Sequence, residues 1–212
     1  MGRPRILLAD DHTLVVQALQ HLLEREFDVV ATVADGRALV EAAAQHEPDV
    51  VIVDIGMPLL NGLDAGERLK ALHPAIKVIY LTQNREPLMA LEAFKRKASG
   101  YVLKDAAASE LTTAIREALR GRWYASPAVA GAVARAGEEV RSDEPTVREL
   151  SAREREVLQL LAEGKAMKEV AAILQISPRT VEFHKYRVMQ VIGAKSNADL
   201  VQYAIRHGLI AP

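Results

Sequence analysis

The 212-residue sequence contains no cysteine, so disulfides, zinc sites built from thiolates and cysteine nucleophiles are all excluded. Long apolar runs are also missing. No uncharged stretch exceeds the twelve residues from Trp123 to Ala134, whereas a membrane-spanning helix needs about 18 or more apolar residues. The first residues, Met1 to Arg5, lack the apolar core of a signal peptide. We therefore expect a soluble, cytoplasmic protein that has no contact with a membrane.

The composition is that of a globular chain, with 50% apolar and 26% charged residues. The length fits one large domain or two small ones, at about 100–200 residues per domain. Charge is unevenly spread: residues 1–145 hold 17 Lys and Arg against 21 Asp and Glu, whereas residues 146–212 hold 10 against 7. The net charges of −4 and +3 suggest two tasks. The basic part is the candidate for binding a polyanion, although such a charge is also common on an ordinary surface.

Short apolar runs alternate with amphipathic stretches in the first half of the chain. This alternation predicts βα units, a parallel sheet and helices on both of its faces. Because Val50–Val53 is apolar throughout, we expect it to be a central strand that is covered on both sides. The expected strands are Ile6–Ala9, Val29–Val33, Val50–Val53, Val78–Leu81 and Gly100–Leu103, and the expected helices are Leu14–Arg25, Gly36–Gln45, Leu63–Leu72, Pro87–Lys97 and Ala108–Arg120.

The C-terminal part shows helical periodicity and no strand pattern. Ser151 and Glu154 have the spacing of a capping box, and Gly164 is a plausible stop signal for the helix that follows them. Ser177-Pro178 provides an N-cap and a first-turn proline for another helix, and Gly208 closes the last one. We expect four helices, with a tight turn between the second and the third.

The two halves are separated by a stretch that is rich in Ala, Gly, Pro and charge. We interpret residues 121–146 as a linker between an N-terminal domain, 1–120, and a C-terminal domain, 147–212. Within this linker, Ser126-Pro127 favours a short helix, and residues 137–145 are typical of a solvated segment.

Five polar residues follow the expected strands at the sheet edge where open parallel sheets bind their ligands. Clustered carboxylates repel one another unless a cation neutralises them, and Mg²⁺ is bound through carboxylate and phosphate oxygens. A metal and a lysine together would stabilise a transferring phosphoryl group, and an aspartate can be the nucleophile. Each residue alone could equally be a cap, a turn or a surface residue, but their coincidence favours phosphoryl transfer. They are Asp10 and Asp11 after the first strand, Asp54 after the third, Thr82 after the fourth and Lys104 after the fifth.

These residues lie in motifs that resemble the receiver domain of two-component response regulators. The resemblance covers roughly residues 4–120, and it implies an α/β flavodoxin-like (CheY-like) fold with five parallel strands in the order 2-1-3-4-5. Asp105 departs from it, because many receivers have proline after the lysine. The motifs are Ile6–His12, Val51–Pro58 with Asn61-Gly62, Val78–Thr82 and Gly100–Lys104.

The resemblance also implies a role for each residue of the site. A sensor histidine kinase would transfer a phosphoryl group to Asp54, and the protein would hold Mg²⁺. A phosphoryl group adds about −1.5 to −2 charge, which attracts a hydroxyl and an ammonium and biases the neighbouring face between two arrangements. Tyr101 matches the family's switch aromatic, although it could also be an ordinary half-buried strand tyrosine. The implied metal ligands are Asp10, Asp11, Asp54 and the backbone carbonyl of Gly56, and the implied phosphoryl contacts are Thr82 and Lys104.

The expected helix at 178–192 has an outer face that mixes aromatic and charged residues. Phe183 and Tyr186 on that face are unexpected for a merely solvated helix. They could pack on sugars or thymine methyl groups while basic residues such as Arg179 meet phosphates. The pattern alone is also compatible with a different role, in which this face binds in a groove of a partner protein.

The same region resembles the LuxR-type (NarL/FixJ-type) DNA-binding domain over about residues 147–210. The motifs are Leu150–Val157, Leu161–Gly164, Lys168–Ala172, Ile176–His184 and Ala198–Val201. The resemblance implies an all-α, four-helix helix-turn-helix domain whose third helix reads DNA and whose fourth pairs two subunits. The implied base contacts are Glu182, Phe183 and Tyr186, and the implied phosphate contacts are Lys168, Thr180, Lys185, Arg187 and Lys195.

We therefore expect a transcription factor controlled by phosphorylation of Asp54. Its partners would be a histidine kinase, promoter DNA and a second copy of the chain, with RNA polymerase as a further candidate. We expect no turnover enzyme, only phosphoryl acceptance and slow self-hydrolysis. A magnesium phosphohydrolase is disfavoured because its second aspartate is replaced by Gly56. A phosphate-independent DNA-binding protein and a protein-interaction module are competing hypotheses.

Overall fold

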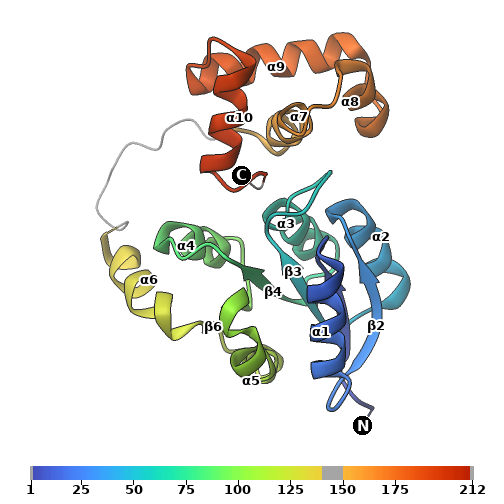
Figure 1. Ribbon diagram of the computed structural model, residues 1–212, viewed down its shortest axis with the longest axis vertical. Coiled ribbons are helices and arrows are strands. Elements are labelled where there is room, and N and C mark those ends of the chain that lie inside the picture. Colours follow the sequence, from blue (N-terminus) through green and yellow to red (C-terminus); the bar gives the residue numbers. More distant parts are fainter. Residues whose placement is uncertain (1, 140–149, 211–212) are drawn as a thin grey trace.

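The computed structural model describes residues 2–139 and 150–210. Figure 1 shows an α/β domain, built from the N-terminal part of the chain, and a smaller helical domain that lies against it. Most of the stretch expected to be a solvated segment, 137–145, falls outside the described residues. In the described part of the chain, no helix is both long and apolar enough to cross a membrane.

A parallel sheet of six strands forms the centre of the α/β domain. Its order, β2-β1-β3-β4-β5-β6, confirms the order 2-1-3-4-5 and adds one strand to the five expected. The added strand pairs with β5 and has only two residues, too few to give an alternating sequence pattern. The strands are β1 Arg5–Ala9, β2 Asp28–Val33, β3 Val50–Asp54, β4 Lys77–Thr82, β5 Gly100–Leu103 and β6 Tyr124–Ala125.

Helices cover both faces of this sheet (Figure 1). Successive side chains of a strand point to opposite faces. Ile6 and Leu8 therefore pack in one apolar cluster with α1 and α5, whereas Leu7 and Ala9 pack in a second cluster with α2, α3 and α4. Strand β3 is buried along its whole length, as predicted for a central strand. The helices are α1 Thr13–Leu23, α2 Gly36–His46, α3 Gly62–Leu72, α4 Pro87–Lys95 and α5 Ala107–Leu119, the last preceded by the 3₁₀ turn η1 Lys104–Ala106.

The first part of the expected linker packs on the α/β domain. Helix α6, Pro127–Glu139, follows β6, and its residues Val129 and Val133 are buried in the apolar cluster that includes α4. Ser126 joins this segment to β5, because its hydroxyl oxygen accepts a hydrogen bond from the Leu103 N–H (3.0 Å). The face formed by α4 and β5 is thus covered by a piece of the chain that follows the α/β domain.

Within the described residues 150–210, the C-terminal domain has four helices, as predicted. The first begins with the capping box of Ser151 and Glu154, and the third begins with Ser177 accepting from the N–H of Thr180. Gly193 ends the third helix with a positive φ of 70°, a conformation that glycine adopts without strain. The helices are α7 Ala152–Ala162, α8 Met167–Leu174, α9 Pro178–Ile192 and α10 Asn197–Arg206.

The loop between β3 and α3 is fixed by two glycines that allow a close backbone approach. A Cβ at Gly62 would lie 2.1 Å from the carbonyl oxygen of Asp54, and a Cβ at Gly36 would lie 2.0 Å from the carbonyl oxygen of Leu60. Only residues without a Cβ fit these places unless the backbone moves. The loop is therefore pressed against the end of β3 and against α2.

We expect Gly62→Ala to lower the free energy of unfolding by about 2 kcal/mol, because overpacking against backbone atoms forces the loop to shift. Urea denaturation followed by circular dichroism measures this change. Gly56→Ala in the same loop is the matched control: its Cβ would have its nearest neighbour at 3.9 Å, so its cost should stay below about 1 kcal/mol. Equal costs at the two positions would contradict the argument from close approach.

Candidate functional site

Three predicted carboxylates meet at the carboxyl edge of the sheet. Asp54 ends β3, and Asp10 and Asp11 follow β1. One oxygen of each lies within 4.8 Å of the others, together with a ring nitrogen of His12. Asp10 and Asp54 are buried, whereas Asp11 and His12 are exposed. Carboxylate oxygens are the hard donors that Mg²⁺ prefers, so the chemistry of the three aspartates fits this ion.

Lys104 joins the two buried carboxylates. Its Nζ lies 2.8 Å from Asp10 Oδ2 and 2.8 Å from Asp54 Oδ2. Burial raises the pKa of Asp54 above its usual value, and the hydrogen bond and charge of Lys104 oppose this rise. Burial alone would lower the pKa of Lys104, but its bonds to the two aspartates outweigh this effect and leave the pKa raised. The site thus keeps a firmly protonated ammonium beside the candidate acceptor.

His12 is a neighbour that the sequence analysis did not single out. Its Nδ1 lies 3.1 Å from Asp10 Oδ1 and 2.9 Å from Asp11 Oδ1, and its backbone N–H donates to Asp10 Oδ1 (2.9 Å). His12 itself occupies the N-cap position of α1, without a side-chain cap. Neither aspartate therefore serves merely as the N-cap of that helix. Proximity to Asp10 and Asp11 in the sequence was the only signal that could have indicated this position.

Thr82 and Tyr101 are connected through Asn84. The hydroxyl oxygen of Thr82 accepts a hydrogen bond from the Asn84 N–H (3.0 Å), and the Tyr101 hydroxyl donates to the Asn84 carbonyl (2.9 Å). Tyr101 is fully buried rather than half-buried, and burial raises the pKa of its hydroxyl above the usual value. A displacement of the Thr82 hydroxyl would therefore reach Tyr101 through one backbone segment.

The other candidate residues lie in the helical domain, mostly on the outer surface of α9. Phe183 and Tyr186 are 56% and 62% exposed. The opposite face of α9 is apolar: Val181 and Val188 are buried. His184 is partly buried beside Phe183, in keeping with local packing. Of the remaining candidates, Lys168, Arg179, Glu182, Arg187 and Lys195 are exposed, and Thr180 and Lys185 are partly buried.

Two candidate DNA contacts have neighbours within the domain. Arg187 Nε lies 3.2 Å from Glu154 Oε1 of α7, so this arginine is oriented by an ion pair. The hydroxyls of Thr180 and Ser177 are 2.8 Å apart at the start of α9. Both contacts fix the side chains on the exposed surface of α9 and at its N-terminus. A helix that presents aromatic and basic groups in this way has the shape of a major-groove reader.

Comparison with known families identifies both domains. Residues 6–116 match the response regulator receiver domain, and residues 148–204 match the bacterial regulatory proteins of the luxR family. The chain belongs to the LuxR-family response regulators. Members of this family are DNA-binding transcription regulators rather than turnover enzymes. This sets aside the magnesium phosphohydrolase and the protein-interaction module.

Full-length relatives share both domains of this response regulator. The oxygen regulatory protein NreC of Staphylococcus carnosus is 35% identical over 97% of this chain and 99% of its own length. The probable transcriptional regulatory protein NarL of Mycobacterium tuberculosis is 32% identical over 97% and 95%. The solved structure of RcsB from Salmonella enterica serovar Typhimurium, bound to a promoter in the presence of the phosphomimetic BeF₃⁻, is 27% identical, covers 95% of this chain and 98% of its own, and has a TM-score of 0.64.

Replacing Lys104 by methionine should lower the free energy of unfolding by about 3 kcal/mol, because two buried carboxylates lose their cation. Added Mg²⁺ should stabilise this variant more than the wild type, since the metal supplies the missing charge. Urea denaturation with and without Mg²⁺ measures both effects. Arg85→Met, which removes an exposed ion pair with Asp105, is the control and should change stability by less than about 1 kcal/mol. Absence of a Mg²⁺ response in both variants would contradict a metal site at the aspartates.

Proposed function

We propose that a sensor histidine kinase phosphorylates this response regulator on Asp54. The observation that carries the proposal is the position of Asp54, buried at the end of β3 and 2.8 Å from the Lys104 ammonium. An oxygen of Asp54 attacks the phosphorus of a phosphohistidine, the new O–P bond forms as the N–P bond breaks, and the imidazole leaves with the bonding electron pair. The product is an aspartyl-phosphate.

Other groups of the site would neutralise the negative charge of the phosphoryl group. Mg²⁺, held by Asp10, Asp11, Asp54 and the carbonyl of Gly56, would neutralise charge on the phosphoryl oxygens. Lys104 turns from Asp10 toward the phosphoryl group. Slow attack of water on the aspartyl-phosphate would return the protein to its starting state.

The conformational change extends from Thr82 to the surface that contains α4. Without the phosphoryl group, the Thr82 hydroxyl oxygen accepts a hydrogen bond from the Asn84 N–H. The phosphoryl group attracts this hydroxyl away from Asn84. Movement of Asn84 removes the carbonyl to which Tyr101 donates, so Tyr101 and the start of α4 take up a second arrangement. The new arrangement favours the form that binds DNA.

The DNA-binding form is a homodimer that places two α9 helices in successive major grooves. Glu182, Phe183 and Tyr186 contact bases, and the basic residues around them contact phosphates. RcsB, a relative with the same two domains, has been solved on a promoter with a phosphomimetic. Helix α10 pairs the two subunits. Binding to promoters places the protein in the cytoplasm with the chromosome, where RNA polymerase is a further partner.

Asp54→Asn should abolish phosphorylation. After incubation with Mg²⁺ and acetyl phosphate, intact mass spectrometry should show one added phosphoryl group on the wild type and none on the variant. Electrophoretic binding to DNA duplexes on the same samples should show at least about fivefold tighter binding by the phosphorylated protein, a typical allosteric coupling. A phosphorylated Asp54→Asn protein would refute the assignment. An unmodified wild type that binds DNA equally well would instead support a phosphate-independent regulator.

Phe183→Ala should weaken DNA binding by at least about fivefold, because contacts to bases contribute about 1–3 kcal/mol each. Lys185→Gln should weaken binding to all sequences alike and reduce the salt slope by about 1, the signature of a lost phosphate contact. Fluorescence anisotropy with a labelled duplex at several salt concentrations measures both. Leu14→Ala, another exposed apolar residue but on α1, should leave binding unchanged. Loss of binding in that control would show that the assay reports folding rather than contact.

A further inference from the structure

The segment that follows the receiver domain covers the face of the sheet on which the Tyr101 side chain lies. Helices α2, α3 and α4 stand on this face, and α6 takes the next place beyond α4 (Figure 1). Val129 and Val133 of α6 are 1% and 7% exposed, and they pack in the apolar cluster that contains Tyr101 and Ala90 of α4. The full burial of Tyr101 thus depends partly on α6.

Ser126 attaches this segment to the receiver through both its backbone and its side chain. Its N–H donates to the Tyr101 carbonyl (2.9 Å), and its hydroxyl oxygen accepts from the Leu103 N–H (3.0 Å). The hydroxyl itself donates to the Glu110 carboxylate of α5. The Ser126 carbonyl accepts from the Val129 N–H at the start of α6 (2.9 Å). A single buried residue therefore connects β5, α5 and α6.

Tyr101 lies between the phosphoacceptor site and this segment. Its hydroxyl donates to the Asn84 carbonyl (2.9 Å), and the Asn84 N–H donates to the Thr82 hydroxyl. Its own carbonyl accepts from the Ser126 N–H. Because α6 packs against both Tyr101 and α4, a second arrangement of these two requires α6 to leave or to repack, since densely packed contacts transmit strain rather than absorb it.

Trp123 lies at the seam between α4 and β6. Its ring packs edge-on against Phe94 of α4, with the ring centroids 5.3 Å apart. Its indole N–H is buried and has no hydrogen-bond partner among the described residues. A buried donor without a partner costs free energy, so contact with water would relieve this cost when the seam opens. Because Trp123 is the single tryptophan of the chain, its fluorescence reports on this seam alone.

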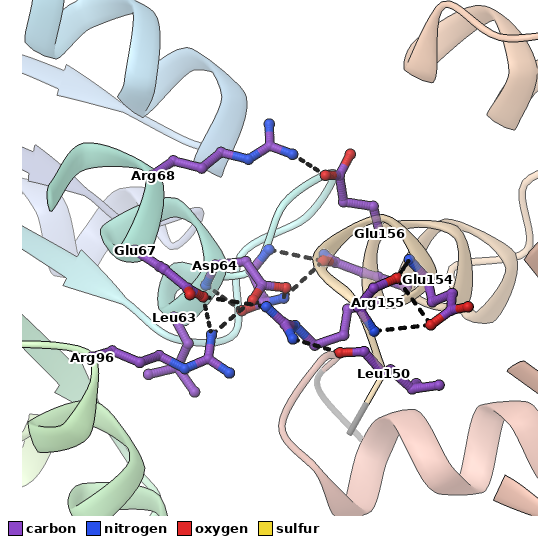
Figure 2. Close-up of polar contacts among 12 residues, drawn as sticks. Leu63, Asp64, Glu67, Arg68, Arg96, Leu150, Glu154, Arg155 and Glu156 are labelled. Atoms are coloured by element: carbon purple, nitrogen blue, oxygen red, sulfur yellow. Dashed lines mark hydrogen bonds and ion pairs between the residues drawn. The ribbon is translucent and has the colours of Figure 1, made fainter. Parts of the chain in front are cut away.

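The DNA-binding domain contacts a different part of the receiver. Helix α7 presents the buried side chains of Glu156 and Gln159 to α3 and to the loop before it. Gln159 bonds the backbone of this loop, in which Leu59 has a positive φ of 64°. Arg155 of α7 lies 2.8 Å from Asp64 of α3 (Figure 2). Since α4 stands between α3 and α6 (Figure 1), the contact of α6 can be measured apart from the domain contact.

We propose that Ser126 is a positioning residue for Tyr101: by attaching α6 to β5, it holds Tyr101 and α4 in their present arrangement and so opposes occupancy of Asp54. The proposal rests on the proposed function, in which occupancy of Asp54 favours a second arrangement of Tyr101 and α4. A ligand that favours this second arrangement binds more tightly when the attachment is weakened, because the coupling between two equilibria is reciprocal. Helix α6 ends at Glu139, and residues 140–149 connect it to the DNA-binding domain, so its release would also move the point at which that domain is attached.

The test compares the full-length wild type with two variants. Ser126→Ala removes the hydroxyl that joins β5 and α5, and Val133→Ala shortens the contact of α6 with α4 and leaves the hydrogen bonds of Ser126 in place. Calorimetry measures the affinity for beryllofluoride in the presence of Mg²⁺, the probe for an occupied Asp54. Both variants should bind beryllofluoride at least about fivefold more tightly, the low end of typical couplings. Without ligand, their Trp123 emission should lie at longer wavelength than that of the wild type, because water reaches the indole.

Two controls separate this effect from general loss of structure. Val40→Ala removes the same methyl groups from α2, at the other end of the helical layer, and should match the wild type in both measurements. Saturating beryllofluoride with Mg²⁺ should move the Trp123 emission of the wild type to longer wavelength and leave that of Asp54→Asn unchanged. Damage to the fold alone would weaken beryllofluoride binding, whereas release of Tyr101 strengthens it.

Three results would overturn the proposal. The first is unchanged or weaker beryllofluoride binding in both variants, and the second is wild-type emission in both variants without ligand. The third is a wild type that binds beryllofluoride with no change in Trp123 emission, which would show that occupancy of Asp54 leaves α6 in place. A wild type that binds no beryllofluoride at all would instead refute phosphorylation at Asp54, while the emission of the variants would still report the contact between α6 and α4.

Discussion

The arrangement of the site at the carboxyl edge of the sheet depends on the balance of charge between Lys104 and two buried carboxylates. Lys104 comes from the end of β5, Asp54 from the end of β3 and Asp10 from the end of β1, so this balance requires three strands to end at one edge. Two negative charges in a buried place are stable only with a cation nearby. A charge added at Asp54 by the proposed phosphorylation would therefore draw Lys104, Thr82 or a metal ion into a new position, which is the basis of the proposed switch.

The β3–α3 loop contacts the end of β3 on one side and the DNA-binding domain on the other. On one side, Gly62 seats the loop against the carbonyl of Asp54. On the other side, Gln159 binds its backbone and the strained Leu59 is packed against the DNA-binding domain. A loop with tight contacts at both ends has few intermediate positions, because packed interfaces switch between discrete states rather than deform gradually. The proposed acceptor and the DNA-binding domain therefore contact the same loop between β3 and α3.

The sequence predicts whatever depends on local periodicity. The parallel sheet, the capping box at Ser151 and the convergence of Asp10 and Asp54 follow from sequence patterns and from the rule that places ligands at strand ends, whereas the strand order is implied by the resemblance to receiver domains. It does not reveal β6, which is too short for a pattern, nor the burial of Glu156 and Gln159. On a helix, polar residues opposite an apolar stripe indicate solvent, and only the second domain turns that surface into an interface. Whether these side chains fit the β3–α3 loop depends on tertiary packing, which sequence periodicity does not reveal.

The chemistry of the domain interface fits a contact that opens and closes. Arg155 and Glu156 regain hydration when they separate from their partners, so the ion pairs contribute little net stability to the closed form. Leu59 is an apolar residue of the receiver that packs against the neighbouring cluster, so opening would expose its side chain and the part of the cluster that it covers. An apolar interface of the same size would hold the domains too firmly for one phosphoryl group to release them. A polar interface keeps the two forms within a few kcal/mol, the range over which a single charged ligand can shift an equilibrium.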